Sequence, residues 1–280
     1  MTPSTRTWFI TGVNSGFGRH MTEQLLARGE RVAGTVRDLA PMQALKEQYR
    51  ERLWLALLDV TDTPAIRRVV DAAFTELGRI DVVVNNAGYG LLGAAEACSD
   101  AQIVHQLETN LVGSIQVARA ALPHLRAQGG GRIIQISTVG GQAAFPGASL
   151  YHAGKWGIEG FMDALGQEVA PFDIGVTIVE PGGARTQFRY GSSVLARKLD
   201  AYAHTPVARV HQMIEERRAV PPGDPARMAA AIIASADQFP APKRLALGSD
   251  AWAAMHQSLS ARLAELETQK ELAASTDYAD

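Results

Sequence analysis

The strongest constraint on the fold of this 280-residue chain is a steady alternation of short apolar segments with longer amphipathic ones. Several apolar segments are continuous or nearly so, as at 82–84 and 133–136, which is typical of strands buried on both faces of a parallel sheet. The intervening segments have helical spacing, and one of them begins near Ser99 and runs toward Arg126. We therefore predict an α/β fold with a doubly wound parallel sheet of about seven strands and helices on both faces. The expected strands are 8–11, 31–36, 53–58, 80–84, 132–137, 175–179 and 244–247.

Two regions depart from this rhythm within what we expect to be a single domain, 1–280. The segment 185–222 is long and punctuated by turns, and an insertion of that size is usually a lid or a binding loop, here expected to bind substrate. From 249 onward, apolar residues recur at spacings of three and four, which predicts an amphipathic helix over 249–272. That helix covers either the domain's own surface or a second subunit. Residues 273–280 are expected to be disordered.

The composition excludes several classes of protein. A net charge of −2 gives no general attraction to nucleic acid or to an anionic membrane, so neither is expected as a partner. Cys98 is the only cysteine, which rules out an intrachain disulfide and suits a reducing compartment. Residues 1–6 lack the features of a signal peptide, and the apolar runs are much shorter than a membrane span. The seven histidines show no metal-ligand spacing. We expect a cytoplasmic protein without a metal.

A glycine-rich turn follows the first expected strand and opens into a helix. Glycine permits a tight turn and close approach of the backbone to a pyrophosphate, and a helix N-terminus offers free N–H groups and a positive dipole. The spacing Gly-x-x-x-Gly-x-Gly differs from the Gly-x-Gly-x-x-Gly of other dinucleotide folds, but the position between strand and helix still predicts a cofactor-binding turn. Its contacting residues are expected to be Gly12, Asn14, Ser15, Gly16, Phe17 and Gly18.

Further turn-forming and polar segments follow other expected strands. Each alone could be a simple turn, but sheets of this kind bind ligands beyond the carboxyl ends of their strands, so together these segments line one binding edge. They comprise Asp59 and Val60 after the third strand, Asn85, Asn86, Ala87 and Gly88 after the fourth, and Pro181 and Gly182 after the sixth.

The tip of the second strand usually selects between NAD and NADP. A carboxylate there binds the ribose 2′-hydroxyl, whereas a basic side chain accommodates a 2′-phosphate. The tip residue Val36 is neutral, and Arg37 follows it with a planar guanidinium that suits phosphate oxygens. This pattern favours NADP. Asp38 comes next and could bind the ribose instead, so NAD remains the alternative.

Tyr151 and Lys155 are four residues apart, which places both on one face of a helix. A nearby ammonium favours the phenolate and lowers the pKa of a tyrosine toward the pH at which acid–base catalysis is efficient. Such pairs also arise by chance on solvated helices, so the surrounding motifs decide what the pair means.

Together these motifs resemble those of the short-chain dehydrogenase/reductase family, in its compact single-domain branch with a Rossmann-type sheet. The resemblance extends from residue 8 to about 248 and is weakest over 188–222. In the family's order, the matching residues are Thr11, Gly12, Gly16, Phe17, Gly18, Asp59, Asn85, Asn86, Ala87, Gly88, Asn110, Ser137, Tyr151, Lys155, Pro181, Gly182 and Thr186.

The resemblance implies a role for each matching residue. Tyr151 would be the general acid in carbonyl reduction, or the base in the reverse reaction, and Lys155 would lower its pKa and bind the nicotinamide ribose. Ser137 would hold the substrate oxygen and stabilise developing negative charge. Asn110 would position a water that links Lys155 to solvent, and Thr186 would contact the nicotinamide carboxamide. The adenosine contacts would come from Asp59 and Val60 at the adenine, and from Asn86, Ala87 and Gly88 at the ribose.

One position departs from the NADP-using members of the family. Some of them carry a basic residue just before the second glycine of the turn, where this chain has Ser15. The prediction of NADP therefore rests on Arg37, with Arg19 as a weaker helper.

The leading hypothesis is an NADP-dependent oxidoreductase that transfers a hydride between nicotinamide and a small carbonyl or alcohol substrate. The family often forms homodimers or homotetramers through the helices around 99–126 and 151–170, and we expect an oligomer here. An apolar substrate is suggested by the residues that should border the catalytic end, Leu91, Leu92, Phe145, Phe188 and Tyr190.

Two alternatives stay open. A non-catalytic dinucleotide sensor of the same fold would be expected to have lost Tyr151, Lys155 or Ser137, all of which this chain retains. A nucleotide-retaining epimerase or dehydratase usually has a longer chain and a different glycine spacing. Hydrolases and phosphate-loop proteins are disfavoured, because neither Gly-x-Ser-x-Gly nor Gly-Lys-Ser/Thr occurs.

Overall fold

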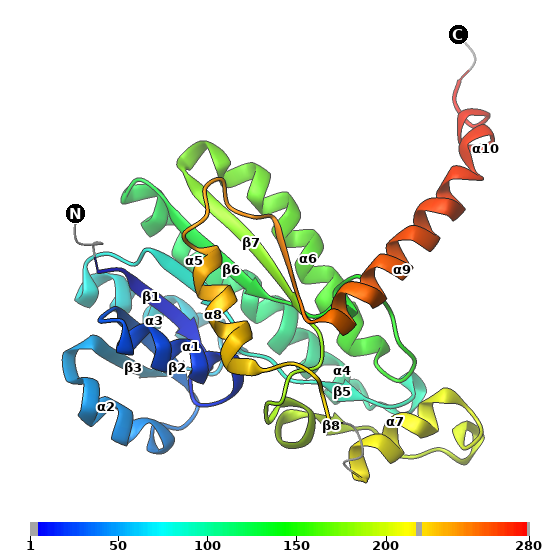
Figure 1. Ribbon diagram of the computed structural model, residues 1–280, viewed down its shortest axis with the longest axis horizontal. Helices are drawn as coiled ribbons and strands as arrows, with labels where there is room; N and C mark the ends of the chain where they lie inside the picture. Colours follow the sequence, from blue (N-terminus) through cyan, green and yellow to red (C-terminus); the bar gives the residue numbers. More distant parts are fainter. Residues whose placement is uncertain (1–4, 217–219, 279–280) are drawn as a thin grey trace.

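The computed structural model describes residues 5–216 and 220–278. Seven parallel strands form one sheet in the order β3-β2-β1-β4-β6-β7-β9, with helices on both sides of it (Figure 1). This arrangement confirms the predicted Rossmann-type α/β fold. The strands of the sheet are β1 (Thr7–Thr11), β2 (Arg31–Val36), β3 (Leu53–Leu57), β4 (Val82–Asn85), β6 (Gly131–Ile136), β7 (Ile174–Pro181) and β9 (Arg244–Leu247).

The predicted strands agree with these to within two residues at each end. The larger differences are at β7, which extends to Pro181, and at β4, which begins at Val82 rather than at Ile80. At β4 the carboxylate of Asp81 accepts a hydrogen bond of 2.9 Å from the Thr7 backbone N–H. The backbone of Asp81 itself is hydrogen-bonded to Thr7 and Arg132 on the two neighbouring strands.

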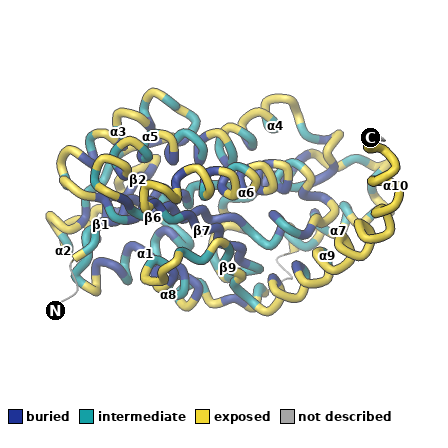
Figure 2. Tube along the Cα trace, turned by 90° about the horizontal axis from the view of Figure 1, so that it is seen from above, coloured by how far each residue is buried: buried dark blue, intermediate teal, exposed yellow. Residues whose placement is uncertain are grey.

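Apolar side chains of the central strands point alternately to the two faces of the sheet, and on each face they pack against a layer of helices. Phe9 packs in the core on one face, whereas its neighbours Trp8 and Ile10 pack on the other, as the two-residue period of a strand requires. All three are fully buried, which explains why their segment is a continuous apolar run. Figure 2 shows the two helical layers on either side of the sheet. One contains α3 (Thr63–Leu77), α5 (Gly113–Ala127) and α6 (Ser149–Val169), and the other contains α1 (Gly16–Ala27), α2 (Gln43–Tyr49) and α8 (Pro225–Ser235).

The helical stretch predicted from Ser99 toward Arg126 forms, but a π-helical turn interrupts it. Helix α4 (Asp100–Leu107) begins at a capping box made by Ser99 and Gln102. Between it and α5, residues Glu108–Val112 form a π-helical turn. Such turns insert one residue into a helix and often occur at functional sites. This one carries the buried Asn110.

The insertion 185–222 has secondary structure of its own. It contains a π-helical turn at Phe188–Ser192, strand β8 (Val194–Leu195) and helix α7 (Pro206–Glu215). Strand β8 pairs in parallel with β5 (Leu91–Leu92) in a separate two-stranded sheet. The insertion is thereby tied to the segment that follows β4. Residues 217–219 lie outside the described residues.

Helix α9 (Ser249–Glu267) projects from the body of the molecule and is followed by α10 (Lys270–Ala274) (Figure 1). Within α9 only Ala251 and Met255 are buried, and Figure 2 shows most of the projection exposed. The predicted helix over 249–272 therefore forms in two pieces, and beyond its first turns it does not cover the body of this chain. Helix α10 reaches Ala274, inside the segment 273–280 that we expected to be disordered.

Among the described helices, none combines the length and the apolar character that crossing a membrane requires.

Candidate active site

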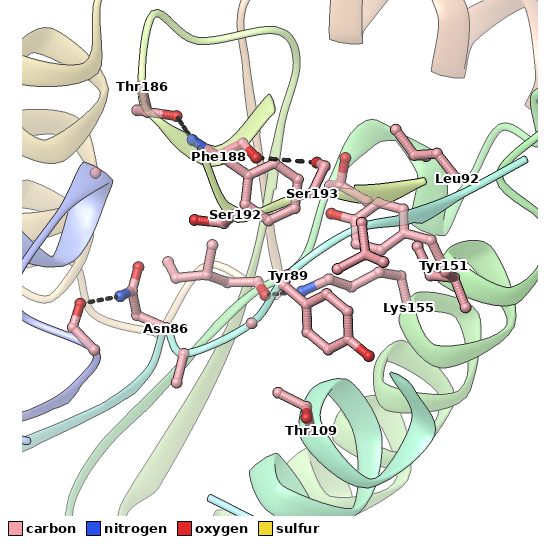
Figure 3. Close-up of a pocket in the computed structure, with 18 of the residues that line it drawn as sticks. Asn86, Tyr89, Leu92, Thr109, Tyr151, Lys155, Thr186, Phe188, Ser192 and Ser193 are labelled. Carbon is pink, nitrogen blue, oxygen red and sulfur yellow. Dashed lines mark hydrogen bonds between the residues drawn. The ribbon is translucent and has the colours of Figure 1, made fainter. Parts of the chain in front are cut away.

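A cleft of about 910 Å³ opens at the carboxyl ends of the sheet strands, between the glycine-rich turn and the insertion (Figure 3). Open α/β sheets bind their ligands at this edge. Most residues predicted from the sequence to bind cofactor or substrate meet here. Those that line the cleft are Gly12, Asn14, Ser15, Gly16, Phe17, Arg37, Asp59, Val60, Asn86, Ala87, Gly88, Ser137, Tyr151, Lys155, Pro181, Gly182 and Thr186.

The glycine-rich turn offers backbone N–H groups to the cleft. Gly12 and Gly16 adopt φ angles of 73° and 53°, a left-handed conformation that favours glycine. Ser15 is the N-cap of α1, but its hydroxyl makes no capping hydrogen bond. The first N–H groups of the helix therefore keep their capacity to bind an anion, and the positive end of the helix dipole points the same way.

Gly18 supports this turn from behind and is not among the residues that line the cleft. A Cβ at this position would lie 2.2 Å from the carbonyl oxygen of Gly12 and 2.6 Å from Nδ2 of Asn86. The absence of a side chain therefore allows α1 to approach the ends of the strands. Asn86 in turn donates hydrogen bonds of 2.8 and 3.0 Å to the carbonyl oxygens of Thr11 and Gly12, which fixes the turn relative to β4.

Charged side chains lie at the second-strand end of the cleft. Arg37 is exposed, and no hydrogen bond of its guanidinium is found among the described residues. Its charge acts on Asp59, whose pKa is lowered because hydrogen bonds from Thr61 and this charge outweigh the opposing effect of burial. Asp38 accepts a hydrogen bond of 3.0 Å from the Ala40 N–H and does not line the cleft.

Arg19, the weaker helper in our prediction, is engaged elsewhere. Its guanidinium forms an ion pair of 2.5 Å with Glu23 and contacts the Pro41 carbonyl oxygen at 3.3 Å. It does not line the cleft. The sequence singled out three charged side chains for this end of the cleft, Arg37, Asp38 and Arg19. Of these, Arg37 alone lines the cleft.

Lys155 and Tyr151 come from the same face of α6, as predicted. The Lys155 ammonium is buried and donates a hydrogen bond of 2.9 Å to the carbonyl oxygen of Ile136. It lies 5.8 Å from the centre of the Tyr151 ring. Figure 3 shows both side chains at the cleft, together with Tyr89 and Phe188. The ring of Phe188, from the insertion, lies 5.8 Å from that of Tyr151.

The pKa of Tyr151 differs from our expectation. We predicted that Lys155 lowers it, but burial of the phenol raises the pKa above its ordinary range, and a hydrogen bond with Thr138 opposes only part of the rise. The physical reason is the burial of both side chains. Burial lowers the pKa of Lys155 to about 8, against the opposing charge of Glu159, and its ammonium is directed at the Ile136 carbonyl.

Ser137 follows β6 and is buried, with its N–H bonded at 2.8 Å to the Val179 carbonyl oxygen. Its hydroxyl donates a hydrogen bond of 2.5 Å to the buried carboxylate of Glu159. Sequence reasoning missed Glu159. Its signal was a carboxylate four residues after Lys155, on the same face of an otherwise apolar helix.

Asn110 lies next to the cleft without lining it. Its side chain accepts a hydrogen bond of 3.0 Å from the Tyr89 N–H and donates one of 2.7 Å to the Tyr89 carbonyl oxygen. A Cβ at Gly88 would lie 2.8 Å from Oδ1 of Asn110 and 3.9 Å from Nζ of Lys155. The π-helical turn thus holds Asn110 beside the lysine. Its role in positioning a water stays a prediction.

Thr186 lies next to the glycine-rich turn, because a Cβ at Gly16 would be 3.7 Å from the Cβ of Thr186. Its hydroxyl accepts a hydrogen bond of 3.3 Å from the Phe188 N–H at the start of the insertion (Figure 3). The same side of the cleft is held by α9, where Asp250 accepts a hydrogen bond of 2.8 Å from the Gly183 N–H.

The other half of the cleft is mainly apolar. Leu91, Leu92, Phe145 and Phe188 line it as predicted, whereas Tyr190 is not among the lining residues. Sequence reasoning missed the contribution of α7, although the helical spacing of its apolar residues was a usable signal. The lining residues that it missed include Tyr89, His105, Thr138, Val210, Met213 and Ile214.

The sequence of the chain matches the family model described as short chain dehydrogenase over residues 6–193. The chain belongs to the short-chain dehydrogenase/reductase family. Members of this family are oxidoreductases that act on alcohol and carbonyl groups and use NAD or NADP.

Individual relatives agree with this assignment. The chain is 36% identical to Oxidoreductase BOA17 of Botryotinia fuckeliana over 248 residues, which cover 88% of this chain and 90% of the relative. It is 37% identical over 179 residues to the 3-ketodihydrosphingosine reductase of Bacteroides thetaiotaomicron, a match that spans 64% of each protein. The crystal structure of a short-chain dehydrogenase from Streptomyces avermitilis is 38% identical, with a TM-score of 0.91, and the match covers 99% of this chain and 100% of that one.

Proposed function

We propose that this short-chain dehydrogenase/reductase is an NADP-dependent reductase of an apolar ketone or aldehyde, with Tyr151 as the acid. The observation that carries the proposal is that Tyr151, Ser137 and Lys155 meet in one cleft that the glycine-rich turn also lines. A phenol is protonated at neutral pH, and burial raises the pKa of Tyr151 further. A protonated phenol is the form that can give a proton to a carbonyl oxygen as it is reduced.

The residues of the cleft have separate roles in the proposed reaction. NADPH, when bound, supplies the hydride. Ser137 holds the substrate oxygen, and Tyr151 donates its phenolic proton to that oxygen as negative charge develops there. Lys155 stabilises the phenolate that remains, because an ammonium a few ångströms away favours the charged form. In the oxidative direction the same phenolate would act as the base.

The cofactor end of the cleft fits a dinucleotide. The N–H groups at the start of α1 suit the pyrophosphate, since the Ser15 hydroxyl does not occupy them. Asp59 and Val60 would meet the adenine, and Thr186 would contact the nicotinamide carboxamide. Asn86, Ala87 and Gly88 would border the adenosine ribose.

Arg37 supports NADP over NAD. Its guanidinium lines the cleft and forms no hydrogen bond among the described residues, so it is free to bind a 2′-phosphate. Asp38, which would favour NAD, lies outside the cleft and holds the Ala40 N–H instead.

The apolar half of the cleft supports an apolar carbonyl substrate. Leu92, Phe188 and Val210 stand on three different segments around it, and the relative from Bacteroides thetaiotaomicron is named for the reduction of 3-ketodihydrosphingosine. We extend this to a preference for ketones with an aliphatic chain, because such a chain would bury its surface against these side chains.

The alternatives from the sequence receive less support. A sensor would not need Tyr151, Lys155 and Ser137 in one cleft, and residues of the insertion, Phe188 among them, line the same cleft as those of a substrate-binding element would. We also propose a homodimer or homotetramer built through the surfaces of the α4–α5 run and α6, as in many family members.

A cofactor-oxidation screen tests the proposal. The purified protein is assayed with NADPH and NADH in parallel, against long-chain aliphatic ketones and short polar ones. We expect turnover with NADPH and a lower KM for the long-chain substrates. Tyr151→Phe should retain NADPH binding, measured by nucleotide fluorescence, but lose turnover by several orders of magnitude. Near-full activity of this variant would refute the acid role.

A further inference from the structure

Helix α9 begins against the turn that follows β7. This turn, residues 181–186, is called the β7 turn below, and all of its residues except Arg185 line the cleft. Asp250, in the first turn of α9, accepts a hydrogen bond of 2.8 Å from the Gly183 N–H. Asp250 does not line the cleft itself. Its carboxylate therefore holds the β7 turn from outside the cleft, and the proposed reaction has no use for it so far.

Two glycines leave the space that this carboxylate occupies. A Cβ at Gly182 would lie 2.2 Å from Oδ1 of Asp250, and a Cβ at Gly248 would lie 2.5 Å from the same oxygen. Any side chain at either position would displace the carboxylate. Gly182 ends β7 and Gly248 precedes α9, so two separate segments of the chain are shaped around one acid. A chance pairing on the surface would not require such a fit.

The start of α9 is itself fixed on the body of the molecule. Ala251 and Met255 are the buried residues of this helix, and they lie one and five positions after Asp250. An acid in the first turn of a helix also interacts favourably with the positive end of the helix dipole. The carboxylate thus has a defined position from which it can hold another segment.

Asp250 supplies one of the two supports of Gly183. The N–H of Gly183 is bound by Asp250, and its carbonyl oxygen accepts a hydrogen bond of 2.9 Å from the Gly223 N–H, on the segment that leads into α8. Without the carboxylate, water would bind this partly exposed N–H, so the donor would stay satisfied. Water is not attached to the fold, however, and the peptide would then be held from one side only.

We propose that Asp250 is a positioning residue that fixes the β7 turn and, through it, the nicotinamide end of the cofactor. The inference rests on the proposed function, in which Pro181, Gly182 and Thr186 bind this end. Thr186 lies next to Gly16 of the glycine-rich turn, so the β7 turn also sets the distance between the two cofactor-binding segments. A shift of the turn would move the hydride donor relative to Tyr151, without disturbing the contacts of the adenosine half at Arg37.

The test separates the two halves of the cofactor in the full-length protein. For Asp250→Ala we expect NADPH to bind about tenfold more weakly, because a hydrogen bond to a charged group is lost from the support of the turn. Adenosine 2′,5′-bisphosphate, which lacks the nicotinamide half, should bind within about twofold of its affinity for the wild type. We also expect kcat to fall by about tenfold or more, since small misplacements of reacting groups are costly. Fluorescence titration and competition measure the affinities.

Two further variants show whether the contact with the turn is responsible. Asp250→Asn keeps an oxygen that can accept from the Gly183 N–H, so it should recover most of the NADPH affinity and of kcat. Ser258→Ala is the matched control in the same helix. It removes the hydrogen bond of 2.9 Å from the Ser258 hydroxyl to the Gln142 carbonyl oxygen, which joins α9 to the body away from the β7 turn. This variant should bind NADPH and turn over as the wild type does.

Two results would overturn the proposal. One is an Asp250→Ala protein with the NADPH affinity and kcat of Ser258→Ala. The other is an equal loss of affinity for NADPH and for adenosine 2′,5′-bisphosphate, which would indicate a general effect on the fold. If Asp250→Ala does not fold, as thermal unfolding would show, Asp250→Ser takes its place, because its hydroxyl is too short to reach Gly183 and the same results are expected.

Failure of the proposed function would look different from failure of this inference. It would appear in the wild type, as an absence of NADPH binding or of turnover, or as an active Tyr151→Phe enzyme. A wild type that binds and oxidises NADPH, combined with an unaffected Asp250→Ala variant, would leave the proposed function in place and refute the role of Asp250.

Discussion

Lys155 shows how a buried cation can be tuned by its surroundings. Burial lowers the pKa of the lysine to about 8, and Glu159 opposes the shift. Below this pKa the side chain is charged and can stabilise a phenolate at Tyr151, whereas above it the side chain is neutral. The charge that the proposed reaction needs is therefore lost within an accessible range of pH.

We predict that kcat/KM falls as the pH rises through about 8, because that ratio reports groups of the free enzyme. Steady-state assays between pH 6 and 10 measure the limb. A Lys155→Arg variant keeps its charge throughout this range, so whatever activity it retains should lack the limb near pH 8. An unchanged limb in this variant would assign the transition to another group.

Arg37 should decide the choice of cofactor. Hydrogen bonds to charged groups contribute about 1.5–3 kcal/mol, so Arg37→Ala is expected to weaken NADPH binding by about 10- to 100-fold and to change NADH binding little. Titration of nucleotide fluorescence gives both dissociation constants. Arg19→Ala is the control, since Arg19 pairs with Glu23 outside the cleft and its loss should affect neither cofactor. Equal losses for both cofactors after Arg37→Ala would refute the phosphate contact.

Helix α1 depends on close packing against the strand ends. Gly18→Ala would place a methyl group 2.2 Å from the Gly12 carbonyl oxygen, a backbone atom that cannot move without distorting the turn. We expect a loss of about 1–3 kcal/mol in the free energy of unfolding, typical of overpacking, and weaker cofactor binding. Gly160→Ala is the control within α6, where nothing lies within 4 Å of the new methyl. It should stabilise the protein by up to about 1 kcal/mol. Urea denaturation of both variants provides the comparison.

The strands and helices differ in how far the sequence predicts them. Continuous apolar runs predict the seven strands of the main sheet, because a strand that is buried on both faces must be apolar at nearly every position. The π-helical turn at Glu108–Val112 leaves no such trace, since one inserted residue changes the helical period only locally. Strands β5 and β8 are two residues long and pair across more than 100 positions of sequence, so no local pattern marks them.

The molecule as a whole consists of a compact body and a projecting arm formed by α9 and α10 (Figure 1). The arm presents Leu259, Leu263 and Leu266 to solvent. Beyond its first two turns it contacts the body through a hydrogen bond of 2.9 Å from the Ser258 hydroxyl to the Gln142 carbonyl oxygen, and through the guanidinium of Arg262 over the Trp156 ring, 4.9 Å from the ring centre. A cation–π contact at an exposed site contributes about 0.5–1 kcal/mol.

Removal of residues 259–280 should therefore change the free energy of unfolding of the body by no more than about 1 kcal/mol. Chemical denaturation of the truncated and full-length chains measures the difference, and sedimentation compares their oligomeric states. A loss of several kcal/mol, or dissociation of an oligomer, would contradict this expectation and would place the arm in a contact between subunits.

The sequence by itself determined the sheet, the cofactor-binding turn and the pairing of Tyr151 with Lys155, because each depends on local spacing or on burial that leaves a periodic trace. Tertiary structure alone decided the environment of that pair. Burial raises the pKa of the tyrosine that we expected Lys155 to lower, and Glu159, Gly141 and Arg244 meet behind Ser137 from separate segments. Such effects depend on desolvation and on contacts between distant residues, which spacing along a chain does not record.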